Sequence, residues 1–179
     1  FYLTSDSSSV SGFIVKLNSF GNFIWARKIS GAVSLAVDSK YNVYTSSFDE
    51  ITKLDSAGNF IWKKKTLVEI DEKDSLNRNY ALTYEITVDN FDNLYLTGSL
   101  DGVFDCDPGP SIFKLVPATD DSSNYVISGF VIKLDNDGNF LWAKELTGPQ
   151  SFCESAAISV DNSGNVYTTG FCAGTTDFE

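Results

Sequence analysis

Three acidic side chains, Asp101, Asp105 and Asp107, crowd one glycine-containing segment of this 179-residue chain. Carboxylates beside exposed carbonyl groups suit Ca²⁺, which takes six to eight oxygen ligands, so the segment predicts a calcium site. The turn that begins at Asp135 also resembles the start of a calcium loop, although it lacks the distal bidentate Glu. The alternative interpretation is that these Asp residues form turns, with carboxylates that accept hydrogen bonds from nearby amides.

Cys153 and Cys172 flank a segment, residues 156–171, that is typical of a β-hairpin. If Val160 lies opposite Asn165, the two cysteines face each other across antiparallel strands. Opposed Cβ atoms then lie about 4.5–5.5 Å apart, close to the ~3.5–4.5 Å that a disulfide requires. We therefore predict a disulfide, which would fit an exported protein. The alternative is a pair of small buried thiols in a packed hairpin.

The chain contains no His. This excludes Ser-His-Asp and Cys-His nucleophiles and the usual zinc sites from the 179 residues. Cys106 has no base near it in the sequence, and we interpret it as an apolar plug rather than a nucleophile. The remaining enzymatic hypothesis is a carbohydrate-active lyase or glycosidase with two carboxylates about 5–10 Å apart, for which Glu85 and Glu154 are conceivable. We predict no catalytic residue and no required cofactor.

The formal net charge is -11, from 24 acidic and 13 basic residues. Such a surface repels nucleic acid phosphates and anionic lipid headgroups, so neither is an expected partner. No apolar run approaches the ~20 residues needed to span a bilayer, and we expect no membrane insertion. Hydrophobic residues make up 42% of the chain and aromatic residues 14%, which excludes a disordered chain.

Two motifs repeat along the chain and indicate its building unit. The first is Gly-Asn-Phe-(Ile/Leu)-Trp, at residues 21–25, 58–62 and 138–142. The second is Asp-x-x-x-Asn-(Val/Leu)-Tyr, at residues 38–44, 89–95 and 161–167. Between them lie runs rich in Val, Ile, Tyr and Phe, which favour strands, joined by Asp and Gly-Asn turns. Each unit therefore predicts four short antiparallel strands.

Repeats of about 40–45 residues that form four strands favour an all-β β-propeller. We expect about three and a half four-stranded antiparallel blades, or roughly 13 strands, in one β-propeller segment over residues 1–179. The expected parts are a partial blade at 1–29, a blade at 33–65, a blade with a long insertion at 80–146 and a partial blade at 156–179. A β-sandwich is the alternative, although its strands need not repeat in sequence.

Residues 36–44, 130–142 and 105–110 resemble the bacterial SBBP repeat, a seven-bladed β-propeller repeat family. The resemblance covers nearly the whole chain, and it implies a scaffold or binding module in a large secreted or cell-surface bacterial protein. No catalytic residues carry over from it. Residues 47–51 depart from the pattern, because they replace the long loop and its Asp-Pro-Gly. A complete ring would need further blades from the same chain or from a partner chain.

The leading functional prediction is a non-catalytic extracellular scaffold or recognition module. We expect a protein or glycan ligand to bind the loops at 66–79 and 99–128, which are longer than a connection needs. Residues 1–5 match residues 94–98, so we expect the chain to begin inside a repeat of a longer protein. An incomplete ring leaves open strand edges, so the alternative is a self-associating structural element.

The three Trp residues of the first motif have two interpretations. Trp25, Trp62 and Trp142 could form a platform on which sugars stack. Their identical positions in successive units favour the other interpretation, in which each is a wedge between adjacent sheets. Lys16, Lys53 and Lys133 also repeat, and we interpret them as solvated or salt-bridged strand residues.

Overall fold

The computed structural model describes residues 2, 12–70, 80–119, 125–149 and 151–178. Within these residues the chain forms fifteen β-strands and no helix, so no helix in the described part could span a membrane. All the strand pairings are antiparallel. The all-β prediction is therefore confirmed.

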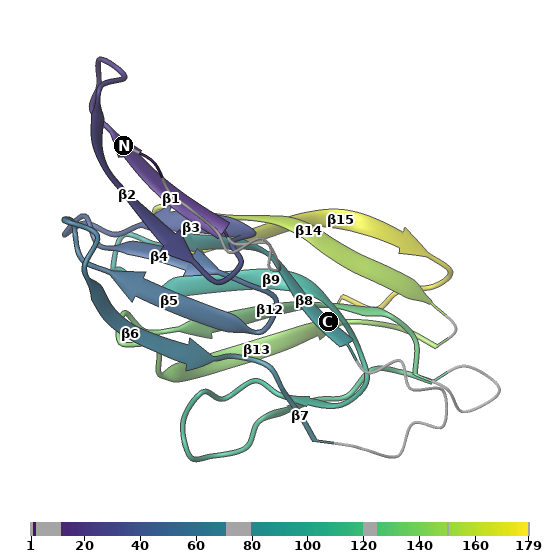
Figure 1. Ribbon diagram of the computed structural model, residues 1–179. Coiled ribbons are helices and arrows are strands. Elements are labelled where there is room, and N and C mark those ends of the chain that lie inside the picture. The colour runs from purple at the N-terminus through teal and green to yellow at the C-terminus, as the bar shows by residue number, and fades with distance from the viewer. Residues whose placement is uncertain (1, 3–11, 71–79, 120–124, 150, 179) are drawn as a thin grey trace.

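Two complete four-stranded sheets form the body of the molecule (Figure 1). The first contains β3 (Ser34–Val37), β4 (Val43–Ser46), β5 (Glu50–Leu54) and β6 (Phe60–Lys65), in that order. The second contains β8 (Tyr80–Val88), β9 (Leu94–Asp101), β12 (Ser128–Leu134) and β13 (Phe140–Leu146), in that order. In both sheets the order of the four strands across the sheet follows their order in the chain, as the four-strand unit predicts.

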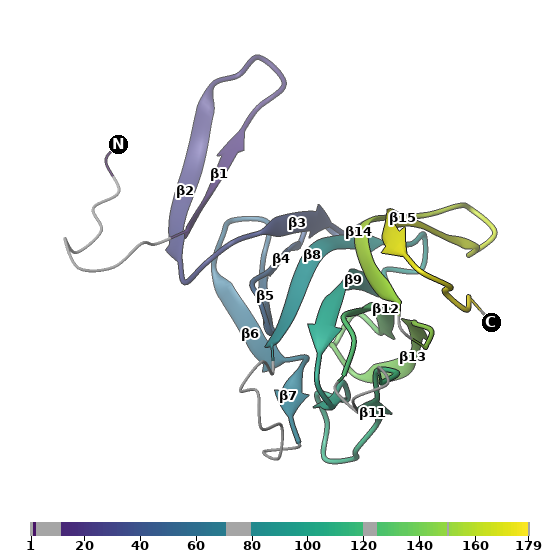
Figure 2. The ribbon, with the colours of Figure 1, turned by 90° about the vertical axis from the view of Figure 1, so that its right-hand side faces the viewer.

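Two separate hairpins flank these sheets (Figure 2). The first consists of β1 (Gly12–Leu17) and β2 (Phe23–Ile29), and the second of β14 (Phe152–Val160) and β15 (Val166–Ala173). Ile14 and Trp25 of the first hairpin pack against Val43 and Leu54 of the first complete sheet. Ile158 of the second hairpin packs against the second complete sheet. The described part is thus a row of sheets, none of which closes on itself.

The expected number of strands was too small. Three two-residue strands, β7 (Val68–Glu69), β10 (Phe104–Asp105) and β11 (Lys114–Leu115), form an additional sheet in the order β11-β10-β7. They lie in the two long loops, where the sequence shows no alternation of apolar residues. The remaining twelve strands occupy predicted positions, and the strand expected at residues 1–5 lies outside the described residues except for Tyr2.

The Asp residue of the second motif organises the turn between the first and second strands. The Asp89 Oδ1 atom accepts hydrogen bonds from the Phe91 and Asn93 amides at 2.8 and 2.9 Å, and Oδ2 accepts from the Tyr95 hydroxyl at 3.0 Å. The same arrangement surrounds Asp38 and Asp161. The motif therefore repeats because one carboxylate satisfies the turn amides and positions the tyrosine.

The Gly residue of the first motif serves both its turn and the neighbouring sheet. Gly58 and Gly138 have φ values of 78° and 73°, which favour glycine. A Cβ atom at Gly58 would lie 3.1 Å from the Trp25 ring, and one at Gly138 would lie 3.0 Å from the Trp62 ring. Two successive tryptophans thus insert against the glycine turn of the next sheet. The wedge interpretation is confirmed for both, and the sugar-platform interpretation is wrong for them.

Two of the three repeated lysines join neighbouring sheets, whereas Lys133 forms the predicted salt bridge, with Asp89 of its own sheet. Lys53 is buried, donates to the Asn136 carbonyl at 2.8 Å, and lies 5.0 Å from the Tyr44 ring centroid. Lys16 donates to the Ser56 carbonyl at 2.9 Å in the same way. The expectation of a solvated lysine is therefore wrong for Lys53, because the next sheet covers it and supplies the acceptor.

Candidate ligand-binding surface

The two loops predicted to bind a ligand come together in one structure. We call the sheet formed by β7, β10 and β11 the accessory sheet; β7 lies in the first loop, and β10 and β11 lie in the second. Phe104 pairs with Glu69 on one side and with Leu115 on the other. The Ile70 amide donates to the Val103 carbonyl at 3.0 Å. Segments distant in the sequence therefore form a single surface.

The accessory sheet is anchored in the main core. Leu67, Phe104, Cys106 and Leu115 are buried in the hydrophobic cluster that extends through the two complete sheets. The Phe113 ring packs against the Phe140 ring of β13 in a tilted arrangement, with centroids 4.7 Å apart. Because the underside is fixed in this way, the outer face is held in place before any ligand arrives, which reduces the entropic cost of binding.

The outer face of the accessory sheet combines apolar and acidic side chains. Val68, Ile112 and Val116 expose large apolar groups; Asp105 pairs with Val68 across the sheet, and Asp107 follows β10 in the chain. Exposed apolar side chains with polar neighbours on anchored loops are common at recognition sites.

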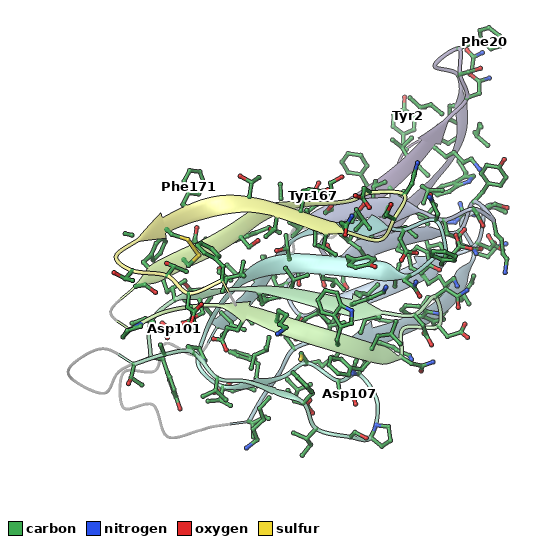
Figure 3. All side chains as sticks on the ribbon, turned by 180° about the vertical axis from the view of Figure 1, so that it is seen from behind. Tyr2, Phe20, Asp101, Asp107, Tyr167 and Phe171 are labelled. Carbon is green, nitrogen blue, oxygen red and sulfur yellow. A yellow bond between two sulfur atoms is a disulfide. The ribbon has the colours of Figure 1, made fainter. Side chains whose placement is uncertain are left out.

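The three carboxylates predicted to bind calcium do not form a ligand cluster. The Asp105 Oδ1 atom accepts from the Asp107 and Phe113 amides at 3.0 and 2.9 Å, and the Asp107 Oδ1 atom accepts from the Gly109 amide at 2.7 Å. Asp101 is buried at the end of β9, and Figure 3 shows it well separated from Asp107. No group of three His, Cys, Asp or Glu residues in the described ranges could hold a metal ion. Asp105 and Asp107 thus act as turn formers here, and the calcium prediction gains no support.

Cys106 is fully buried beneath the accessory sheet, and its thiol donates to the Phe113 carbonyl at 3.2 Å. Burial, with the nearby negative charge of Asp105, raises the pKa of this thiol to about 12. The thiol is therefore protonated at neutral pH, which agrees with an apolar plug and disfavours a nucleophile.

Glu145 is a half-buried acid that the sequence patterns did not indicate. Its Oε2 atom accepts from the Val116 amide at 3.1 Å and so holds the second loop, directly after β11, against β13. Burial raises its pKa, although hydrogen bonds from Val116 and Ser128 oppose the shift. The available signal was a departure from the repeat, because Lys28 and Lys65 occupy the position of Glu145 in the other units.

Glu85 and Glu154, the conceivable catalytic acids, make contacts between the second complete sheet and the β14–β15 hairpin. The Glu85 Oε2 atom accepts from the Ile158 amide at 2.6 Å. The Glu154 Oε1 atom accepts from the Tyr84 hydroxyl at 3.4 Å. These contacts give both carboxylates a structural role between neighbouring sheets.

Cys153 and Cys172 form a disulfide, with Cα atoms 4.2 Å apart in opposed positions of β14 and β15. The prediction is confirmed, but the register assumed for it was wrong. Val160 pairs with Val166 rather than with Asn165, and a bulge between Ser155 and Ala157 then shifts the register by one residue. The bulge brings the cysteines opposite each other.

We expect reduction of this disulfide to lower the free energy of unfolding by about 3 kcal/mol, because the bond closes a loop with a sequence separation of 19 residues. Urea unfolding followed by tryptophan fluorescence, with and without reductant, measures the difference. The double variant Cys153→Ser/Cys172→Ser should match the reduced protein and show no response to reductant. Equal stability of oxidised and reduced wild-type protein would contradict the prediction.

No protein-family model and no curated protein matches this chain. The SBBP family therefore stays a prediction that rests on the resemblance of the sequence motifs.

Proposed function

We propose that this chain is a β-propeller segment of the SBBP type, and that it serves as a non-catalytic scaffold and recognition module in a larger extracellular bacterial protein. The observation that carries the proposal is the repeated contact between neighbouring sheets. Trp25 meets the Gly58 turn, and Trp62 meets the Gly138 turn in the next sheet. A contact that repeats from one sheet to the next supports radial stacking of blades, and it is not expected in a β-sandwich.

An extracellular location is supported by one covalent feature. The disulfide between Cys153 and Cys172 is of a kind that persists in oxidising compartments and is rare in the cytosol. The net charge of -11 agrees with a partner other than nucleic acid or an anionic membrane.

The accessory sheet is the proposed recognition surface, and a protein or glycan is the proposed ligand. The sheet is fixed to the core by Leu115 and by the contact between the Phe113 and Phe140 rings, while Ile112 and Val116 remain exposed. Such side chains can contact a protein, or the apolar face of a sugar, at little cost in conformational entropy.

A surface variant tests the recognition role without removing core residues. The triple variant Val68→Ser/Ile112→Ser/Val116→Ser replaces three exposed apolar side chains of this surface and leaves the buried residues beneath it unchanged. A matched control changes three exposed aromatics in turns outside the accessory sheet: Phe20→Ser/Tyr41→Ser/Phe91→Ser. Both variants and the wild type are applied to arrays of defined glycans and peptides.

We expect the accessory-sheet variant to lose at least tenfold in affinity for any array ligand of the wild type, because buried apolar contact is removed. The control variant should bind like the wild type, and circular dichroism should show equal strand content in all three. Equal binding by the two variants, or no wild-type binding on either array, would count against recognition at this surface.

A further inference from the structure

A groove lies between the first hairpin and the first complete sheet. Its volume is about 460 Å³, and it is lined by residues 27–30, by Thr52 and Leu54, by residues 58–60 and by Lys63. The end of β2 forms one wall, and β5, β6 and the turn between them form the other. None of the residues that line it belongs to the accessory sheet.

The repeat of the strands identifies the equivalent place between the two complete sheets. Trp25 and Trp62 each lie opposite the repeated lysine of their sheet, and Ser30 and Leu67 both stand five residues after the tryptophan. Leu67 is buried in the main core, and the chain continues from it into β7 of the accessory sheet (Figure 2). Ser30 is exposed, and the chain then enters β3. The first groove therefore lacks the cover that the chain itself supplies to the second.

An aromatic side chain shows the same contrast. Phe60 and Phe140 each pair with the leucine at the register shift of their hairpin. Phe113 of the second loop packs against Phe140, which is half-buried. Phe60 is 65% exposed, because residues 47–49 connect β4 to β5 where the second complete sheet has the long loop. Phe60 thus presents a ring that no loop of its own sheet covers.

The groove is positively charged. Arg27, Lys28 and Lys63 line it, and no Asp or Glu is among the residues that line it. Lys63 forms an ion pair with Glu50, whereas Lys28 has no ion pair within the described residues. The net charge of the chain is -11, so this groove attracts carboxylates that most of the surface repels.

Arg27 is held in place before any ligand binds. Its Nε and Nη2 atoms donate to the Gly58 and Ala57 carbonyls at 2.7 and 3.0 Å, and Nη1 donates to the Ala26 carbonyl at 3.0 Å. Further N–H groups of the guanidinium remain for a ligand carboxylate. A side chain fixed in this way loses little conformational entropy when it binds.

The segment that covers the equivalent place shows which occupant suits the open groove. Residues 104–115 present Phe113 to Phe140, and they carry Asp105 and Asp107. They are partly extended, with short strands at both ends. A segment of the same kind suits the open groove, because its ring would meet Phe60 and its carboxylates would meet basic side chains.

We propose that the groove between β2 and β6 binds an extended peptide segment of a partner protein. An aromatic side chain of this segment packs on Phe60, and its carboxylates face Arg27 and Lys28. Because the groove and the accessory sheet share no residue, this inference goes beyond the recognition role proposed above. The affinity should fall as salt is added, since exposed charges contribute to it.

Fluorescence anisotropy with short synthetic peptides tests the proposal. The probe is the labelled peptide Gly-Ser-Asp-Glu-Phe-Asp-Glu-Ser-Gly. One comparison peptide has Ala in place of Phe, and the other has Lys in place of every Asp and Glu. We expect the wild-type protein to bind the probe, and to bind each comparison peptide at least tenfold more weakly.

Two single variants locate the binding site. Lys28→Glu and Phe60→Ser should each weaken binding of the probe by about tenfold or more, because one reverses a charge of the groove and the other removes its exposed ring. The matched controls are Lys144→Glu and Phe91→Ser, which change exposed side chains outside the groove and should leave binding unchanged. Circular dichroism should show equal strand content in all four variants.

Three results would overturn the proposal. The first is a wild-type protein that does not bind the probe, and the second is binding that survives both Lys28→Glu and Phe60→Ser. The third is binding of oligogalacturonate in place of the peptide, with the same loss in the two variants, since the occupant would then be an acidic glycan. The test of the accessory sheet uses different variants, so each of these results leaves that recognition role intact.

Discussion

Replacing Asp89 with Ala is expected to lower the free energy of unfolding by about 3 kcal/mol or more, because it removes a buried acceptor shared by several donors. The Asp89 carboxylate accepts from the Phe91 and Asn93 amides, the Asn93 side chain and the Tyr95 hydroxyl, and Lys133 lies 3.6 Å away. Tyr95 is fully buried, so its hydroxyl would lose its acceptor. Urea unfolding at neutral pH measures the change.

Asp161 supplies the matched control for this prediction. Its carboxylate accepts from Ser163, Asn165 and Tyr167 in the same geometry, but Tyr167 is exposed and water can replace the lost acceptor. Asp161→Ala should therefore destabilise much less than Asp89→Ala. An equal loss of unfolding free energy in Asp89→Ala and Asp161→Ala would contradict the prediction, because burial of the turn would then contribute nothing to stability.

The same carboxylate gives a pH dependence with a definite sign. Burial alone would raise the pKa of Asp89, but hydrogen bonds from Asn93, Phe91 and Tyr95 outweigh it and lower the pKa below 3.8. Its contribution to stability is therefore present above about pH 4 and is lost as the pH falls through the lowered pKa. The difference in unfolding free energy between wild type and Asp89→Ala should accordingly shrink in acid. If the difference in unfolding free energy stayed constant as the pH fell below about 4, this pH dependence could not come from the Asp89 carboxylate.

Replacing Trp62 with Ala is expected to cost about 3 kcal/mol, because the ring fills the space between the two complete sheets. The ring contacts the Gly138 turn, lies 6.0 Å from the Tyr44 ring and is approached by Lys53 and Lys64. The buried Trp62 indole N–H has no hydrogen-bond partner in the described structure. Trp62→Phe should therefore retain most of the stability, since it keeps an aromatic ring and removes only an unpaired donor.

Trp142 is the matched control for Trp62. It holds the same position in the second complete sheet and packs on Tyr95, with ring centroids 6.1 Å apart, but no glycine turn of a following sheet meets it in the described residues. Trp142→Ala should be less destabilising than Trp62→Ala. Thermal unfolding of the three variants compares them, and an equal loss from both Ala variants would contradict the wedge role.

Hairpins and their turns were predictable from the sequence because the interactions that form them are local. Asp89 and Asn93 are four residues apart, and the Asp89 carboxylate accepts a hydrogen bond from the Asn93 amide within one turn. Gly138 has a positive φ, a backbone conformation that few other residues adopt. The disulfide could also be predicted from the sequence, because both cysteines belong to one hairpin. Even there the bulge near Ser155 was not predicted, and the expected pairing of Val160 was one residue away from the observed one.

What the sequence by itself determined is the four-strand unit, its repetition and the all-β class, since each depends on residues close together in the chain. Only the tertiary structure decided that Glu69 pairs with Phe104, that Glu145 accepts a hydrogen bond from the second loop, and that Lys53 is covered by the next sheet. These contacts join segments with no common local pattern. Their formation depends on which surfaces the packed sheets bring together, and a local pattern carries no information about that.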